Sequence, residues 1–579
     1  MRMLAMNDPG INLSQEATIG HPRLLTFGGL FSMLNTAINV TDNVIGYLNL
    51  RTGADKSRYL STRRRACFQR PPIPGVIRNP EQHRSSQLCT RSEMSIDSDL
   101  RPKETPLMYL IARIRKFLPP LIAGSFLLSV PCFTQEAGTA ASGWNEVPAI
   151  LQRIVPPKFP ARDFNVTEYG AVGDGKTDCS KAFADAIDKC NKAGGGRVVV
   201  PAGLYSTGAI HLKSNVNLYI SKEATIRFST DPSKYLPVVY TRWEGTECMN
   251  YSACIYAFEQ TNIAVTGEGT LDGQSSDANW WLWKGNREAA AGKSNQNEAR
   301  KKLLEMGEKN VPVKDRLFGE GSFLRPNFFQ PYRCTNVLVE GVTFKNSPMW
   351  FLNPVLCKNV SVIGVTTQGH GPNNDGCDPE SCTDVLIKNC RFDTGDDCIA
   401  IKSGRNNDGR RVNVPCENVI VQGCTMRDGH GGVVIGSEVS GSVRNVYAED
   451  CSMDSPNLWH LLRIKTNAVR GGVVENVFVR NVKAGQVAQA VLRIDFYYEE
   501  GDKGTFTPVV RNVEMKNIES AQSQFGIWIR AYDHSPAANI SIEHCTFNNV
   551  AEPNVLDNVR NLSLIDVQTN YQKDAKTVK

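Results

Sequence analysis

The chain has 579 residues, 41% of them hydrophobic, and a formal net charge of +6. That length is ample for a large core arranged in one or two domains. Most of the excess charge lies in residues 1–107, which hold 14 Lys and Arg against 9 Asp and Glu. The remainder is close to neutral, which excludes a generally basic protein that coats nucleic acid.

Residues 1–107 show no sustained hydrophobic period and include several prolines and the basic run Arg63-Arg64-Arg65. Such a segment is predicted to be disordered or a non-native upstream extension, with a small unrecognised domain as the alternative. From Met108 the pattern changes, and basic residues precede an apolar run over 117–130. We predict that residues 108–137 are a signal peptide and that the protein is exported, either secreted or periplasmic. This run is short for a membrane span, and no other stretch is predicted to cross a membrane.

The predicted folded domain covers residues 160–570 and opens with a strand and a glycine-rich turn near Phe164. Residues 179–193 have helical spacing, with apolar side chains recurring on one face. A helix at the start of a strand array is expected to close its open end, because terminal repeats need capping.

From residue 336 the strand pattern becomes a repeat with steps of 22 to 36 residues. Each unit opens with Asn or Asp, alternates apolar and polar residues, and turns into a second short strand. One unit cannot bury its own apolar face, so the units must stack. We therefore predict an all-β fold, a right-handed parallel β-helix with an N-terminal capping helix, since a propeller would need a steadier and longer period. The units begin at Asn336, Asn359, Asp384, Asn418, Asn445, Asn476, Asn512, Asn539 and Asn561.

Four of the 17 cysteines occupy the same place in their repeats: Cys390, Cys424, Cys451 and Cys545. A recurring small apolar side chain inside a stack predicts packed thiols rather than disulfides. Local bridges within the pairs Cys377/Cys382 and Cys179/Cys190 remain open alternatives. The Cys and His spacing matches no zinc site, and no metal or other cofactor is predicted.

Two insertions interrupt the repeat, at residues 280–330 and 405–416. The first contains a Trp-rich run that either anchors the loop to the coil or stacks on sugar rings, and we favour anchoring. The second carries Arg405, Arg410 and Arg411. If these insertions wall off one end of a groove, their cations are placed to hold the end of an acidic polymer.

Acidic, basic and imidazole side chains recur in register within the repeats. Asp396 and His430 each lie twelve residues into successive units, so stacking places them on adjacent coils. Asp375 belongs to the preceding coil, and Asp397 follows Asp396. Arg463 and Lys465 are two apart, which puts them on one face of a strand. An isolated Asp375 would be read as a turn residue, but four motifs in register favour a catalytic groove.

The motifs Asn-x-Asp-Gly, Gly-Asp-Asp, Gly-His-Gly and Arg-Ile-Lys, in this order, resemble those of the polygalacturonases, the pectin-hydrolysing family of glycoside hydrolases. The resemblance spans roughly residues 160–570 and departs from the family at Asn374, where Thr is usual. The insertions look more like those of bacterial, exo-acting members. The implied substrate is a pectic polysaccharide or oligogalacturonide.

The resemblance implies a role for each residue. Asp396 would be the general acid, with its pKa raised by nearby like charges, and His430 would tune that acid or bind substrate. Asp375 and Asp397 would activate water on the opposite side of the bond, giving inversion. The candidate substrate-binding residues are Arg463, Lys465, Lys402 and Arg405.

Two other functions remain to be distinguished. A β-helix lyase would cleave by elimination, depend on calcium and release an unsaturated product. A non-catalytic polysaccharide-binding β-helix would keep the groove without needing an acid/base pair, and the Gly-Asp-Asp and Gly-His-Gly motifs in register disfavour it.

We expect Met108 to be the translated start, so that residues 1–107 never form part of the mature enzyme. Mass spectrometry of the native exported protein tests this expectation. Peptides from residues 1–107 in mature material would contradict it.

Overall fold

The computed structural model of the protein describes residues 143–286 and 290–572. The predicted upstream extension (1–107) and signal peptide (108–137) lie outside these residues. Within the described part, no helix is both long and apolar enough to cross a membrane.

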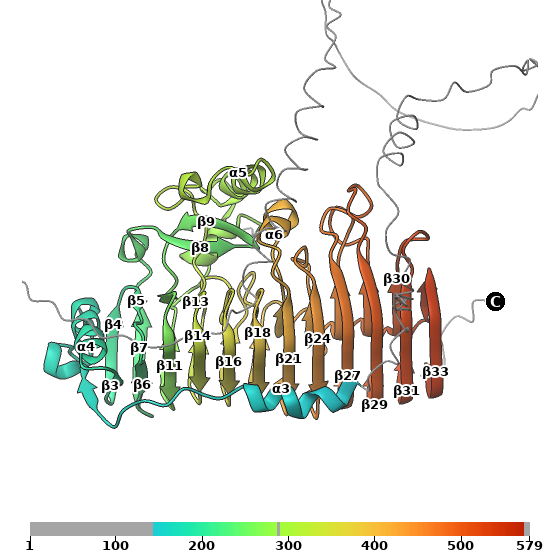
Figure 1. Ribbon diagram of the computed structural model, residues 1–579, viewed down its shortest axis with the longest axis horizontal. Helices are drawn as coiled ribbons and strands as arrows, with labels where there is room; N and C mark the ends of the chain where they lie inside the picture. The colour runs from blue at the N-terminus through green and yellow to red at the C-terminus, as the bar shows by residue number, and fades with distance from the viewer. Residues whose placement is uncertain (1–142, 287–289, 573–579) are drawn as a thin grey trace, which may run out of the picture. The chain divides into compact units, whose positions relative to one another are not determined.

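The described residues form a coil of short parallel strands, with a few helices on its surface (Figure 1). The helices are α3 (Val147–Arg153), α4 (Ser180–Lys192), α5 (Asn297–Glu308) and α6 (Asn406–Val412). The 3-10 helices are η1 (Gly143–Glu146), η2 (Val166–Tyr169), η3 (Pro232–Tyr235), η4 (Trp280–Lys284) and η6 (Val313–Asp315).

The largest sheet contains 22 strands. They are β1 (Asp163–Asn165), β2 (Asp174–Asp178), β3 (Gly196–Val200), β4 (Gly203–Thr207), β6 (Val216–Ile220), β7 (Ala224–Phe228), β11 (Thr261–Gly267), β12 (Thr270–Asp272), β14 (Thr335–Glu340), β15 (Thr343–Lys345), β16 (Lys358–Ile363), β17 (Thr366–Gly369), β18 (Thr383–Lys388), β19 (Arg391–Thr394), β21 (Cys416–Gln422), β22 (Thr425–Met426), β24 (Val443–Glu449), β25 (Ser452–Met453), β27 (Val473–Gln486), β29 (Val509–Gln522), β31 (Ala537–Val550) and β33 (Val559–Tyr571).

Two smaller parallel sheets complete the coil, and an antiparallel hairpin projects from it. The first consists of β5 (Ile210–His211), β10 (Ile255–Phe258) and β13 (Phe329–Tyr332). The second consists of β20 (Ile399–Ile401), β23 (Val433–Ile435), β26 (His460–Lys465), β28 (Ala490–Asp495), β30 (Phe525–Arg530) and β32 (Val555–Asp557). The hairpin pairs β8 (Val239–Trp243) with β9 (Thr246–Asn250). Single bridges at Leu352 and Cys377 join β13 to β20, so the two small sheets form one face.

Strands stack on their counterparts one coil away, which confirms the predicted right-handed parallel β-helix. β14 pairs with β16, β16 with β18 and β18 with β21, each in parallel register. This register aligns Val337, Val360 and Val385 in one buried row. Each such side chain contributes roughly 1.5–3 kcal/mol when it is buried, so the repeat builds the core one coil at a time.

The Asn or Asp that opens each repeat stabilises the bend in its coil by a side-chain hydrogen bond to the neighbouring coil. All nine have φ between 54° and 59°, the left-handed region that Asn tolerates better than most residues. Their side chains bond the same position one coil away, as Asn445 Nδ2 does to Asn418 Oδ1 at 3.0 Å. Asn476 Nδ2 donates to Asn445 Oδ1 at 3.0 Å. The residue type therefore satisfies the backbone bend and the stacking together.

The helix α4 buries the face that the sequence predicted, including Phe183, Ala186, Ile187 and Cys190. It lies beside β1 and β3 at the blue end of the coil (Figure 1). That it closes the end of the core stays a prediction. All 14 cysteines in the described part of the chain are buried free thiols, so the alternative bridges Cys377/Cys382 and Cys179/Cys190 are wrong.

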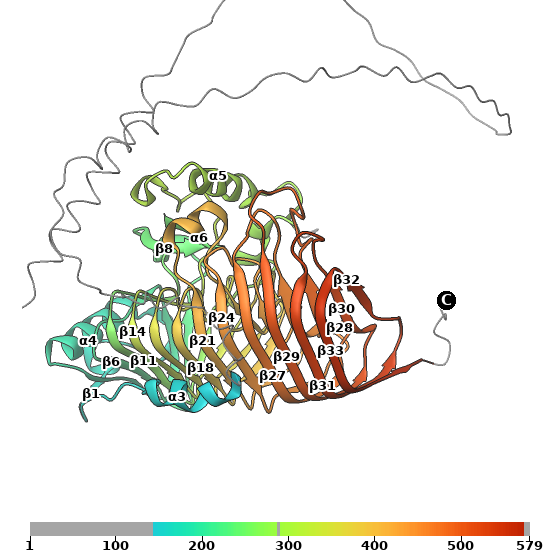
Figure 2. The ribbon, with the colours of Figure 1, turned by 45° about the vertical axis from the view of Figure 1, so that its right-hand side comes forward.

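The insertions and the hairpin gather on one side of the coil. α5, α6 and β8 lie on this side in both views (Figures 1 and 2). In the first insertion Trp280 is buried and makes edge contacts with Tyr235 and Trp283. The Trp-rich run therefore anchors the loop to the coil, as favoured from the sequence.

The asparagine row gives a direct test of what sets the bend. Asn445→Ala should lose about 3 kcal/mol, because two ladder bonds and a tolerated left-handed conformation disappear. Asn445→Gly loses the bonds but keeps the backbone freedom, so it should be more stable than the Ala variant by about 1 kcal/mol. Urea unfolding of both variants measures the difference. An Ala variant as stable as the Gly variant would refute the backbone part of the explanation.

Candidate active site

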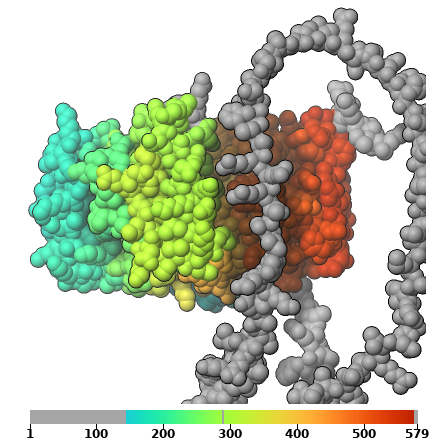
Figure 3. Space-filling model, turned by 90° about the horizontal axis from the view of Figure 1, so that it is seen from above, coloured from blue at the N-terminus to red at the C-terminus, as the bar shows by residue number. Residues whose placement is uncertain are grey.

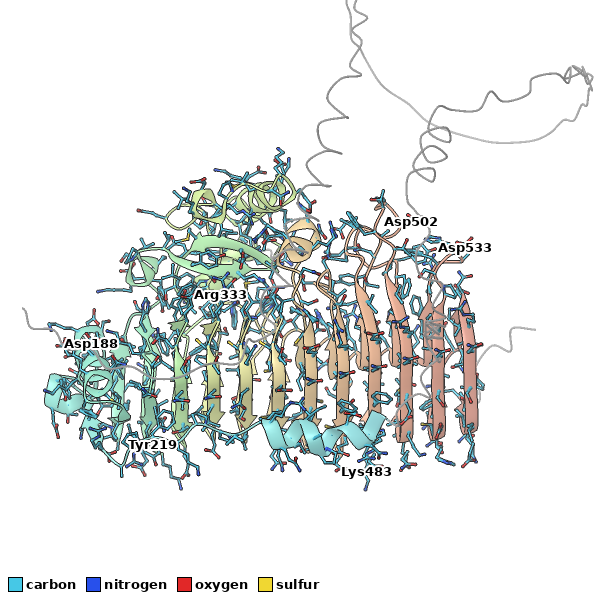
Figure 4. All side chains as sticks on the ribbon, viewed as in Figure 1. Asp188, Tyr219, Arg333, Lys483, Asp502 and Asp533 are labelled. Atoms are coloured by element: carbon cyan, nitrogen blue, oxygen red, sulfur yellow. The ribbon has the colours of Figure 1, made fainter. Side chains whose placement is uncertain are left out.

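A cavity of about 300 Å³ opens on the side of the coil that carries the insertions. Six of the eight predicted site residues line it: Asp375, Asp396, His430, Lys402, Arg405 and Lys465. In the space-filling view the surface is recessed between the green insertion and the red last coils (Figure 3). Figure 4 shows Asp502 on a loop of the later coils that extends to the same side, and that loop also carries Tyr498 and Glu499 of the cavity wall.

Backbone bonds between coils fix the positions of the acids. Asp375 precedes the bridge at Cys377, and Asp396 and Asp397 lie between β19 and β20. Gly376 N donates to Asp397 O at 2.9 Å, and His430 N donates to Asp396 O at 3.0 Å. Three successive coils are thereby locked at the residues that carry the carboxylates and the imidazole.

Gly429 explains why glycine precedes His430. Its φ is +148°, and a Cβ there would lie 2.5 Å from the backbone oxygen of Asp396. A side chain at this position would push the two coils apart. The first glycine of the Gly-His-Gly motif is therefore needed for the coil that carries His430 to lie close to the coil that carries Asp396.

The structure brings Asp396 and His430 together, with Asp396 Oδ1 and His430 Nδ1 2.8 Å apart. The imidazole stacks on Trp459 with ring centroids 3.9 Å apart, which fixes the orientation of its ring. Burial alone would raise the pKa of Asp396, but His430, Lys465 and Lys402 outweigh it and lower that pKa below the usual range. The expectation that like charges raise the pKa of Asp396 is therefore wrong for the free enzyme, because cationic and hydrogen-bonding groups dominate its surroundings.

The raised pKa belongs to Asp375 instead. Burial, followed by the charges of Asp378 and Asp396, raises the pKa of Asp375 well above its usual range. Burial does the same to Asp378, a residue that the sequence analysis did not select. Lys402 Nζ lies 3.6 Å from Asp375 and 3.8 Å from Asp378. The third position after Asp375 in Asn-Asn-Asp-Gly-Cys-Asp was the signal that could have identified Asp378.

Asp397 is fully buried behind the cavity and contacts the two cations predicted to share a strand face. Lys465 Nζ donates to Asp397 Oδ2 at 2.7 Å, and Arg463 Nη1 lies 3.8 Å from Oδ1. Burial lowers the pKa of Lys465, but Asp397 reverses this effect and the pKa is raised. Lys465 lines the cavity, whereas Arg463 lies just behind it, against the ring of Tyr498.

Of the arginines in the second insertion, Arg405 reaches the cavity and the other two do not line it. Arg410 donates to the backbone oxygens of Val469 and Arg470 at 3.0 and 3.1 Å. Arg411 pairs with Glu247 and Asp408. Arg410 and Arg411 therefore hold the insertion in place. This differs from the expected role, which was to bind the end of a substrate chain.

Arg405 is held between acids that the sequence analysis missed. It lies 3.5 Å from both Glu244 and Glu438 and 3.1 Å from Glu499. Glu438 also lies 3.2 Å from Lys402, and it follows β23 closely in the chain. Glu244 and Glu499 lie in loops outside the repeat, which have no register that could have identified them.

Asp396, Asp397 and His430 offer ligand atoms within 4.8 Å of one another, the spacing of a cation site. His370, Asp393 and Asp428 form a second group of this kind. In the first group the Lys465 ammonium already contacts Asp397 at 2.7 Å, so a metal there would compete with a built-in cation. The expectation of a metal-free site stays a prediction.

Known proteins are similar to this chain in sequence and in fold. The family model described as glycosyl hydrolases family 28 matches residues 320–544, and one described as rhamnogalacturonase A/epimerase, pectate lyase-like, matches residues 164–224. A hyperthermoactive exopolygalacturonase from Thermotoga maritima has a solved structure that is 44% identical, with a TM-score of 0.72, and the match covers 74% of this chain and 96% of that one. The chain belongs to glycosyl hydrolase family 28.

The family-28 assignment makes the protein a glycoside hydrolase, as the motifs predicted. Two further relatives are more distant. A probable polygalacturonase of Vitis vinifera is 27% identical over 68% of this chain and 75% of its own length. An exo-poly-alpha-D-galacturonosidase of Dickeya chrysanthemi is 28% identical over 64% of this chain and 62% of its own length.

The contact between His430 and Asp396 predicts a measurable coupling. His430→Asn removes the imidazole whose contact lowers the pKa of Asp396, so this pKa should rise by about 1–2 pH units, the value of one charged hydrogen bond. Carbon-13 NMR titration of labelled aspartate carboxyls, assigned by loss of the signal in Asp396→Asn, measures it. His544→Asn, which removes an exposed imidazole paired with Asp566, is the matched control. An unchanged pKa of Asp396 in His430→Asn would contradict the coupling.

Proposed function

We propose that this family-28 enzyme is an exported, exo-acting polygalacturonase that hydrolyses α-1,4-galacturonosyl linkages of pectin with inversion. The observation that carries the proposal is one cavity in which acids, an imidazole and several cations meet beside the two insertions. The similarity to the Thermotoga maritima exopolygalacturonase and the Dickeya chrysanthemi exo-poly-alpha-D-galacturonosidase supports both the substrate and the exo mode. Pectin hydrolysis takes place where the polymer is found, which supports export.

The proton that reaches the glycosidic oxygen comes from the Asp396–His430 pair. One proton shared by these two groups is held either as imidazolium with carboxylate or as imidazole with carboxylic acid, and the contact of 2.8 Å allows the exchange. In the free enzyme the lowered pKa of Asp396 favours its carboxylate form. An anionic substrate that excludes water favours the second form, because it disfavours a further negative charge nearby. Asp396 then protonates the departing oxygen.

Water completes the reaction from the opposite side of the bond. Asp375 and Asp397 hold it, and its oxygen attacks the anomeric carbon as the bond to the departing oxygen breaks. Asp375 is the better acceptor of the water's proton, because its raised pKa reflects a higher proton affinity. Asp397 lies against Lys465 and Arg463, and its carboxylate stabilises the positive charge developing on the sugar. One water is consumed, and one proton passes from the Asp396–His430 pair to the departing oxygen.

Cations on the wall bind the sugar carboxylates. Lys465 faces the cavity with Tyr498 beside it and Arg463 behind, which suits a galacturonate carboxylate that shares the ammonium with Asp397. In the described part of the chain, Lys402 contacts three acidic side chains of the protein, and Arg405 contacts four. The first effect of these two cations is therefore to neutralise the acids of the cavity wall, which would otherwise repel a polyanion.

Asp396→Asn should lower turnover by at least three orders of magnitude, because proton donation and the local charge are both lost. Reducing-sugar release from polygalacturonate measures the loss, and circular dichroism checks the fold. Asp393→Asn is the matched control, since this acid lies three residues away on β19 and does not line the cavity; it should keep activity within about twofold. An Asp396→Asn enzyme within tenfold of the parent would show that Asp396 is not the acid.

Exo attack is tested by following viscosity and product size together on polygalacturonate. We expect monomer or dimer to appear early while viscosity persists, because a walled cavity accepts a chain end and not an internal segment. Rapid loss of viscosity with mixed oligomers would overturn the exo mode alone. Products that absorb as unsaturated uronides would instead identify a lyase and overturn the hydrolytic mechanism.

A further inference from the structure

The cavity wall contains cationic side chains whose surroundings differ. They come from both insertions and from the coil itself, and they are Lys284, Arg300, Lys402, Arg405 and Lys465. A cation that is already paired with a protein acid must share that acid with an incoming anion. One that has no partner is available at once.

Four of the five are paired within the protein. Arg300 Nε lies 2.6 Å from Glu244, and Lys465 Nζ lies 2.7 Å from Asp397. Lys402 contacts Glu438 at 3.2 Å, and Arg405 contacts Glu499 at 3.1 Å. These pairs include the other acids that line the cavity besides Asp375 and Asp396, which are Glu244, Glu438 and Glu499.

Lys284 differs from the other four. Within residues 143–286 and 290–572 its ammonium has neither a hydrogen bond nor an ion pair, although it is half-buried in the cavity wall. Burial lowers the pKa of this ammonium, and the charge of Glu244 opposes that effect. A partly desolvated cation without a partner costs free energy that a bound anion would recover.

The backbone that presents Lys284 is fixed before any ligand arrives. Lys284 is the last residue of η4, and Gly285 follows with φ of 81°. Trp280 is buried in the core of the coil, and Trp283 contacts it with ring centroids 4.6 Å apart. Trp281 Nε1 donates to Ser347 O at 3.0 Å. Three anchors within one helical turn hold the backbone that carries Lys284, so little backbone ordering remains to be done when an anion binds.

The position of Lys284 along the coil indicates which sugar it meets. Its insertion lies between β12 and β13, in coils that precede Asp396, whereas Lys465 lies on β26, in a coil that follows it. The acid that protonates the departing oxygen is therefore flanked by one cation on each side in coil order. A chain crossing the cavity places successive galacturonate residues against these two cations.

We propose that Lys284 is the centre of a second carboxylate-binding subsite, which takes the carboxylate of the terminal galacturonate that the enzyme releases. This inference rests on the proposed function and adds to it a rule of specificity. A free terminal carboxylate pairs with the ammonium, whereas a methyl-esterified one is neutral and leaves Lys284 without a partner. The enzyme should therefore discriminate against pectin chains whose terminal residue is esterified.

The test compares Lys284→Met with the parent on two trigalacturonates. One has free carboxylates throughout, and the other carries a methyl ester on the residue that the parent releases. The variant should lose about 10- to 100-fold in kcat/KM on the free substrate, the effect of one charged hydrogen bond. On the esterified substrate it should change by less than about twofold, so the preference for the free acid disappears.

Two controls separate charge from structure. Lys284→Arg keeps a cation and should retain most of the preference. Lys301→Met removes an exposed lysine of α5 outside the cavity and should leave both rates unchanged. Equal losses on both substrates in Lys284→Met, or no loss on either, would overturn the subsite.

Failure of the proposed function gives a different result. A parent that does not hydrolyse trigalacturonate contradicts the function and leaves the binding site to be decided by calorimetry with free galacturonate. In that measurement, weaker binding by Lys284→Met than by the parent supports the carboxylate subsite. Equal binding by the two proteins, or no binding by the parent, overturns it.

Discussion

The parallel hydrogen bonding between successive coils is the constraint on which the site depends. Two of these bonds, from Gly376 N to Asp397 O and from His430 N to Asp396 O, lie at the motifs that carry the proposed catalytic residues. The same stacking aligns the valines of the core and the asparagines of the bend. Residues more than twenty positions apart in the chain are therefore held at hydrogen-bonding distance by the backbone, before any side-chain interaction contributes. The groove needs no loop to order it, and this suits catalysis by preorganised charges.

That rigidity concentrates charge, and the molecule balances it with cations from neighbouring coils and from the insertions. Asp397 is matched by Lys465 and Arg463, and Glu438 by Lys402 and Arg405. Removing one partner of such a pair would leave a buried charge exposed to a low dielectric, which is far more costly than the pair itself. Burial raises the pKa values of Asp375 and Asp378. The site thus combines a carboxyl whose pKa is lowered, Asp396, with carboxyls whose pKa is raised, and such a separation of pKa values assigns different roles to neighbouring acids.

The sequence predicted the coil because its repeat carries both the alternation of a strand and the Asn that accepts a left-handed bend. It also predicted which acids, imidazole and cations meet, since register converts position in the repeat into position in space. The sequence predicted the wrong direction for the pKa shift of Asp396. Contact with His430 lowers this pKa, and a count of charges in the sequence does not reveal that contact. The sequence also missed Glu244 and Glu499, because loops outside the repeat have no register. It selected Arg405 as a substrate-binding residue, but it also expected Arg410 and Arg411 to hold the end of the polymer. Those three arginines look equivalent in sequence, and only the packing of α6 assigns them different partners.

The central claim is that coil register assembles an acid and a water-holding pair on opposite faces of one glycosidic bond. Proton NMR of the product anomers during the first minutes of trigalacturonate hydrolysis tests it most directly. An α-linked substrate attacked by water from the opposite face gives the β-anomer first, with the α-anomer appearing later by mutarotation. Initial release of the α-anomer would show retention of configuration and contradict the assignment of Asp375 and Asp397 to water.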